Sequence, residues 1–133
     1  MKNVLILSVL FMSMSFYGQS VMASGQAYIG SGNDLANAKK SENYVIVTIK
    51  PQSKTVGFSV NGNVQNYRIV SSNLTNGGKT LKYMLSGEMA MTTSLMSKID
   101  IIVFPWDPSN ATVGFIKVKL TDDDKRLLGL NRN

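Results

Sequence analysis

The chain has 133 residues, 14 basic and 8 acidic side chains, a formal net charge of +6, and neither cysteine nor histidine. Without these two residue types it cannot form a Ser-His-Asp triad, a Cys-His dyad, a zinc site of the usual ligands or a disulfide bond. The length suits one domain with one modest core. The positive charge is spread too thinly to indicate nucleic-acid binding.

The N-terminus has the three-part layout of a secretory signal. Lys2 supplies a positive charge, an apolar run follows over residues 4–16, and a more polar stretch leads to small or short side chains at 21–23. We therefore predict a signal peptide over residues 1–23, cleavage before Ser24, and export to the periplasm or the medium. The apolar run is shorter than the ~20 residues that span a bilayer, although a membrane anchor is the alternative. No later stretch is long enough, so we expect no transmembrane segment after signal removal.

Beyond the signal, the composition predicts a flexible leader and then a β domain. Residues 24–42 are rich in Gly, Ser, Asn and Ala and are expected to be mobile. Residues 43–120 contain six or seven β-branched or alternating segments separated by turn residues. We predict an all-β fold, a small antiparallel meander that closes as a barrel or a sandwich. The segment Gly87–Ser97 fits either a strand or a helix.

The sharpest local pattern is Asn61-Gly62, which favours a two-residue type I′ turn between strands. A loop of that length places Val60 opposite Asn63, Phe58 opposite Gln65 and Val56 opposite Tyr67. The alternation of apolar residues agrees with this register.

The C-terminal residues 121–133 are predicted to form a short helix and a tail. Thr121 precedes three consecutive aspartates, which suit the first turn of a helix, and Gly129 is expected to end it.

We predict a binding site around the single tryptophan. Trp106 is flanked by Phe104 and Asp107 within the stretch Phe104-Pro105-Trp106-Asp107-Pro108. An aromatic ring on a stiff turn beside a carboxylate can serve as a platform for a sugar ring or for an apolar side chain of a partner. The alternative is that Trp106 plugs the end of the barrel.

These observations predict a non-enzymatic exported protein that binds a ligand or partner, or has a structural role in the envelope. The partner would be an envelope component, a glycan or a protein, and we expect no metal ion or cofactor. One alternative is an inhibitor of a secreted hydrolase that uses the hairpin at Asn61-Gly62 as a wedge. Another is a carboxylate-based glycan-active enzyme that uses Glu88 or Asp100.

Overall fold

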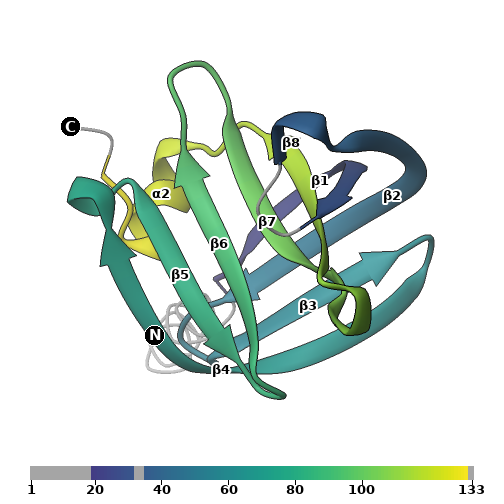
Figure 1. Ribbon diagram of the computed structural model, residues 1–133. Helices are drawn as coiled ribbons and strands as arrows, with labels where there is room; N and C mark the ends of the chain where they lie inside the picture. The colour runs from purple at the N-terminus through teal and green to yellow at the C-terminus, as the bar shows by residue number, and fades with distance from the viewer. Residues whose placement is uncertain (1–18, 32–34, 132–133) are drawn as a thin grey trace, which may run out of the picture.

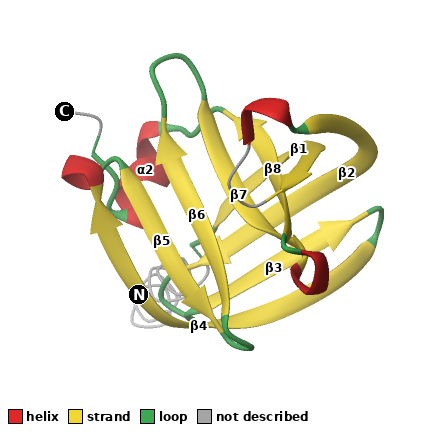
Figure 2. Cartoon of the chain, in the orientation of Figure 1, coloured by secondary structure: helices red, strands yellow, loops and turns green. Residues whose placement is uncertain are grey.

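The computed structural model describes residues 19–31 and 35–131 and shows a closed barrel of eight antiparallel strands in chain order (Figure 1, Figure 2). Each strand pairs with the next one, and β1 also pairs with β8, which closes the barrel. The strands are β1 (Val21–Ser31), β2 (Lys39–Lys50), β3 (Thr55–Val60), β4 (Asn63–Thr75), β5 (Thr80–Leu85), β6 (Met89–Leu95), β7 (Asp100–Asp107) and β8 (Thr112–Val118). The helical elements are the 3-10 turns η1 (Leu35–Asn37), η2 (Asn76–Gly78) and η3 (Pro108–Asn110), and the helix α2 (Asp122–Leu128).

The predicted all-β antiparallel meander with a short C-terminal helix is confirmed, and the sheet closes as a barrel and not as a sandwich. The barrel has eight strands instead of six or seven. The ambiguous segment Gly87–Ser97 contains strand β6, whose backbone groups pair with β5 on one side and with β7 on the other. Met91, Thr93 and Leu95 turn into the barrel. Pairing on both sides satisfies the backbone without a helix.

The predicted flexible leader over residues 24–42 is wrong, because most of it belongs to β1 and to the beginning of β2. Ala23 pairs with Val47 of β2, and Tyr28 pairs with Phe115 of β8. The small residues of this stretch suggested flexibility, but a narrow barrel favours small inward side chains such as Ala27, which is fully buried.

The β domain therefore begins at Val21 and not at residue 43. Cleavage before Ser24 would divide β1 and remove Val21, which is fully buried and pairs with Ile49. The predicted signal lies mostly outside the described residues, over 1–18.

The β3–β4 hairpin has the predicted register. Val60 lies opposite Asn63, Phe58 opposite Gln65, and Val56 opposite Tyr67. Asn61 and Gly62 both have positive φ, at 51° and 91°, as a type I′ turn requires. The turn lies at the end of the barrel opposite to α2 (Figure 1).

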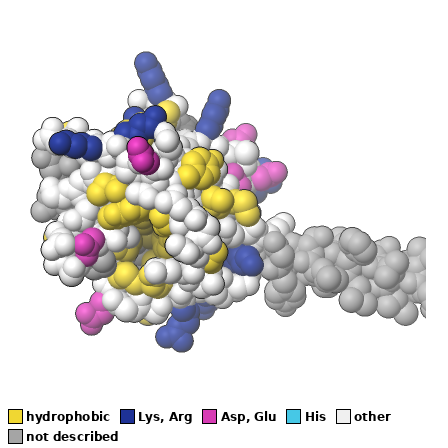
Figure 3. Space-filling model, turned by 90° about the vertical axis from the view of Figure 1, so that its right-hand side faces the viewer, with side chains coloured by type: hydrophobic (Ala, Val, Ile, Leu, Met, Phe, Trp, Pro, Cys, Tyr) yellow, Lys and Arg dark blue, Asp and Glu magenta, His cyan; other side chains and the backbone are white. Residues whose placement is uncertain are grey.

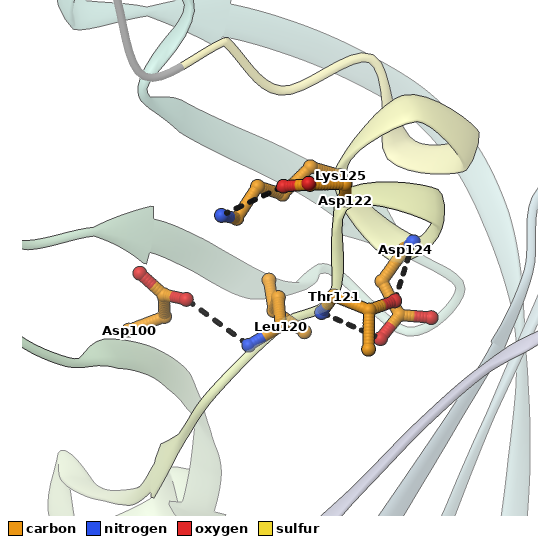
Figure 4. A network of polar contacts seen from close by, with 6 residues as sticks. All are labelled: Asp100, Leu120, Thr121, Asp122, Asp124 and Lys125. Carbon is orange, nitrogen blue, oxygen red and sulfur yellow. Dashed lines mark hydrogen bonds and ion pairs between the residues drawn. The ribbon is translucent and has the colours of Figure 1, made fainter.

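Helix α2 closes the other end of the barrel, and Thr121 caps it as predicted (Figure 4). The Thr121 hydroxyl accepts from the Asp124 amide at 3.1 Å, and the Asp124 carboxylate accepts from the Thr121 amide at 3.2 Å. Gly129 ends the helix at a φ of 77°. Leu128 and Leu130 are buried against the barrel core. This end is therefore filled by apolar side chains.

The barrel interior contains mostly apolar side chains. Its fully buried members include Met91, Ile102 and Ile116. Burial raises the pKa of Tyr83 to about 12, because an ionised phenolate loses its hydration there. Within residues 19–31 and 35–131, none of the helices has the length and apolar character needed to cross a membrane.

Candidate binding site at the mouth of the barrel

A cleft of about 450 Å³ lies at the open end of the barrel. Figure 3 looks onto this side of the molecule and shows a hollow with hydrophobic side chains in its depth and charged side chains around its outside. The walls come from β2, β3, the β3–β4 turn, β4 and β7. The lining residues are Asn43, Phe58, Val60, Asn61, Asn63, Gln65, Tyr67, Phe104, Pro105 and Trp106. We call this site the mouth cleft.

Four aromatic rings from three strands form a continuous array in the mouth cleft. The Phe58 ring contacts Tyr67 at a centroid distance of 5.8 Å and Phe104 at 5.6 Å, and Phe104 contacts Trp106 at 6.3 Å. These separations and the tilted geometries are those that aromatic pairs favour. Phe58 and Phe104 are buried, while Tyr67 and Trp106 are half-buried and offer ring surface to the cleft.

Gly114 on β8 makes room for this array. A Cβ at Gly114 would lie 2.8 Å from Cε2 of Phe104 and 3.2 Å from Cε3 of Trp106. Neither ring can keep its place if a side chain is added there. The positions of the Phe104 and Trp106 rings therefore depend on glycine at position 114.

Pro105 lies within β7, so the stretch expected to be a turn is largely strand. The strand continues to Asp107, with a register shift between Pro105 and Asp107 in its pairing with β8. A bulge tolerates proline because the missing N–H is not needed in the ladder there. Phe104, Pro105 and Trp106, at the end of β7, all line the mouth cleft.

The second component of the mouth cleft is a set of side-chain amides. Asn63 and Gln65 precede Tyr67 on the inward face of β4, and Asn43 lies on the facing strand β2. The Tyr67 hydroxyl donates to Gln65 Oε1 at 2.7 Å. The Gln65 amide nitrogen has no hydrogen-bond partner among the described residues and can donate to a ligand.

Asn61 orders the rim of the mouth cleft. Its Nδ2 donates to Asn43 Oδ1 at 2.7 Å, and its Oδ1 accepts from the Tyr44 amide at 3.1 Å. By contrast, neither the Asn63 side chain nor the Trp106 indole N–H has a hydrogen-bond partner among the described residues. The bonds of Asn61 thus order the rim, and two of the lining residues keep polar groups without a partner among the described residues.

Of the three predicted site residues, the structure brings two into the mouth cleft. Phe104 and Trp106 line it, whereas Asp107 is not among its walls. The Asp107 carboxylate accepts from Ser109 Oγ at 2.6 Å and from Asn110 Nδ2 at 2.8 Å. Both bonds lower the pKa of Asp107 below its usual value, and the bond from Ser109 has the larger effect. Asp107 therefore holds the β7–β8 turn that follows Trp106, and its role in binding stays a prediction.

Sequence reasoning missed most of the other walls. A usable signal was present in β4, where the inward series Asn63, Gln65, Tyr67 and Ile69 changes from polar to apolar. Such a change along one face marks the place where a barrel interior opens to water. The contribution of Asn43 depends on the pairing of β2 with β3 and has no comparable local signal.

The two carboxylates proposed for glycan chemistry lie far apart. Glu88 directly precedes β6, and Asp100 pairs with Leu95 at the other end of the same strand. A rise of about 3.3 Å per residue separates them by roughly 20 Å, whereas glycosidase carboxyl pairs lie within roughly 10 Å. Asp100 is buried near α2, where it accepts from the Leu120 amide at 3.1 Å (Figure 4).

The described residues also contain no group of three or more acidic, histidine or cysteine side chains placed to hold a metal ion. Comparisons with protein-family models, with curated proteins and with solved structures give no match for this chain. The interpretation of the mouth cleft therefore rests on its own geometry and chemistry.

Proposed function

We propose that this protein is an exported, non-enzymatic binding protein that holds a small ligand in the mouth of its barrel. The mouth cleft is the observation that carries the proposal. Its volume of about 450 Å³ falls within the range of about 300–1,000 Å³ found for ligand pockets. Aromatic walls with a few convergent polar groups are the usual lining of such pockets, and barrel mouths are a common place for them.

The asymmetry of the barrel supports the same proposal. One end is filled by Leu128 and Leu130 together with the helix that carries Leu128. The other end exposes parts of Trp106 and Tyr67, although burying them would have stabilised an isolated barrel. An exposed apolar hollow rimmed by polar groups is typical of a binding site.

Export is the second part of the proposal, with a revised processing site. Val21 and Ala23 belong to the barrel, so processing has to leave them in place. Gly18 and Ser20 are small residues at the two positions before Val21 that a signal peptidase reads. We therefore propose cleavage between Ser20 and Val21 instead of before Ser24.

The test of the binding function uses N-phenylnaphthylamine, a neutral aromatic probe whose fluorescence rises in apolar surroundings. We expect the wild-type protein to bind the probe and to transfer energy from Trp106, its only tryptophan. Trp106→Leu keeps an apolar side chain but removes the ring, and we expect affinity to fall about fivefold to tenfold.

The matched control is Leu74→Ala, which changes a part-exposed apolar side chain on β4 away from the mouth cleft. This variant should bind the probe like the wild type. Absence of probe binding, or equal affinity in the wild type and in a folded Trp106→Leu variant, would contradict the proposed function.

A further inference from the structure

We infer that the ligand of the mouth cleft is a neutral saccharide, stacked on Trp106 and Tyr67 and hydrogen-bonded by Asn63 and Gln65. The inference rests on the proposed binding function and adds the chemical class of the ligand. It follows from three properties of the lining residues. They carry no charge, they include polar groups without protein partners, and they expose aromatic ring surface.

The first property is the lack of charge. None of the ten lining residues is charged, although the whole chain carries a formal net charge of +6. A charged ligand would lose hydration in the cleft without gaining an opposite charge. The lining therefore favours a neutral ligand.

The second property is the set of hydrogen-bonding groups without protein partners. Gln65 Nε2, the Asn63 side chain and the Trp106 indole N–H have no partner among the described residues. A purely apolar ligand would cover these groups without replacing their water. Each such loss costs about 1–3 kcal/mol. The ligand must therefore carry oxygens that accept hydrogen bonds.

The third property is the exposed aromatic surface. Trp106 and Tyr67 are half-buried, and both line the mouth cleft together with the amides of Asn63 and Gln65. An aromatic face attracts an apolar or weakly polarised C–H surface. A sugar ring has C–H groups on its faces and hydroxyl and ether oxygens around its edge. It satisfies the aromatic walls and the amide donors together while remaining uncharged.

The experiment titrates the wild-type protein with neutral oligosaccharides of several linkages, and with an acidic uronic-acid oligosaccharide for comparison. Trp106 emission and displacement of N-phenylnaphthylamine are the two readouts. We expect at least one neutral saccharide to shift the Trp106 emission and to displace the probe, and the acidic one to do neither.

Two variants on one strand test the hydrogen bonds. Asn63→Ala changes an amide that lines the mouth cleft, whereas Asn66→Ala changes one on the outer face of β4. We expect Asn63→Ala and Gln65→Met to weaken saccharide binding about fivefold to tenfold. Asn66→Ala should change neither saccharide binding nor probe binding, because the Asn66 side chain lies outside the mouth cleft.

The outcomes separate the two proposals. If N-phenylnaphthylamine binds in a Trp106-dependent way but no saccharide displaces it, the saccharide inference is wrong and the binding function stands. Equal binding of neutral and acidic saccharides, or an equal effect of Asn63→Ala and Asn66→Ala, would also overturn the inference. If neither probe nor saccharide binds, the proposed function fails as well.

Discussion

Among single residues, the two buried polar side chains of the described barrel differ in their surroundings. Asp100 is 1% exposed, and its carboxylate accepts from the Leu120 amide. Thr93 is 0% exposed, and its hydroxyl has no hydrogen-bond partner among the described residues. An unpaired buried hydroxyl has lost its water without compensation. An apolar side chain of the same shape at position 93 should therefore make the protein more stable.

We predict that Thr93→Val stabilises the protein. Valine has nearly the same shape, and it removes the unpaired hydroxyl, so the free energy of unfolding should rise by about 1 kcal/mol. Urea unfolding of the two proteins measures the difference. Thr93→Ser is the control, because it keeps the hydroxyl and removes a methyl group, and it should lower stability. A loss of stability in Thr93→Val would mean that the hydroxyl has a partner in solution, such as a buried water.

At the scale of the elements, closure of the barrel depends on strand β1. The composition of this segment predicted a flexible leader and not a strand. Gly25 and Ala27 read as loop residues locally, yet this strand joins β2 to β8 and closes the barrel. The closure pairs the last residues of β1, Tyr28 to Ser31, with the first residues of β8, Thr112 to Phe115, and so covers these edges of the sheet. The same small side chains that lower strand propensity allow the strand to pass close to the core.

We predict that a protein starting at Val21 is more stable than one starting at Ser24. The shorter chain loses the buried side chains of Val21 and Ala23 and their pairing with Ile49 and Val47. Burial of a valine side chain alone contributes about 1.5–3 kcal/mol, so we expect a loss of at least that size. Urea unfolding of the two purified proteins measures it.

The intact mass of the exported protein gives an independent check on the N-terminus. A mass that begins at Val21 supports the proposed processing site. Equal stability of the two proteins, or an exported chain that begins at Ser24, would contradict it.

At the scale of the whole molecule, the net charge and the proposed binding site involve different residues. The whole chain has a formal net charge of +6, whereas none of the residues that line the mouth cleft is charged. Charged side chains surround the hollow in Figure 3 without lining its depth. Long-range attraction to anionic surfaces and recognition of a ligand in the cleft should therefore respond differently to salt.

We predict that binding in the mouth cleft is nearly independent of sodium chloride concentration. The affinity for N-phenylnaphthylamine should change by less than about twofold between low and high salt, because no charged lining residue is available to be screened. Co-sedimentation of the same protein with anionic liposomes serves as the comparison, and any binding there should fall at high salt. A steep salt dependence of probe binding would show that a charged group takes part.

Much of the local structure was predictable from the sequence because the relevant interactions span few residues. The Asn61-Gly62 turn and the alternation on both sides set the β3–β4 register. Thr121 and Gly129 marked the beginning and the end of α2 by capping rules of the same range. Trp106 and Phe104 were singled out as candidate binding residues, but Trp106 was expected on a turn and not within strand β7.

The tertiary structure alone decided the closure of the barrel and the assembly of the mouth cleft. The period of residues 87–97 fitted a helix as well as a strand, and pairing with β5 and β7 selected the strand. Tyr28 pairs with Phe115, although most of the chain separates them in sequence. Likewise, Asn43, Phe58 and Trp106 line one cleft but come from three different strands. Local patterns carry no information on such partners, because distant pairings depend on how the whole sheet curves and packs.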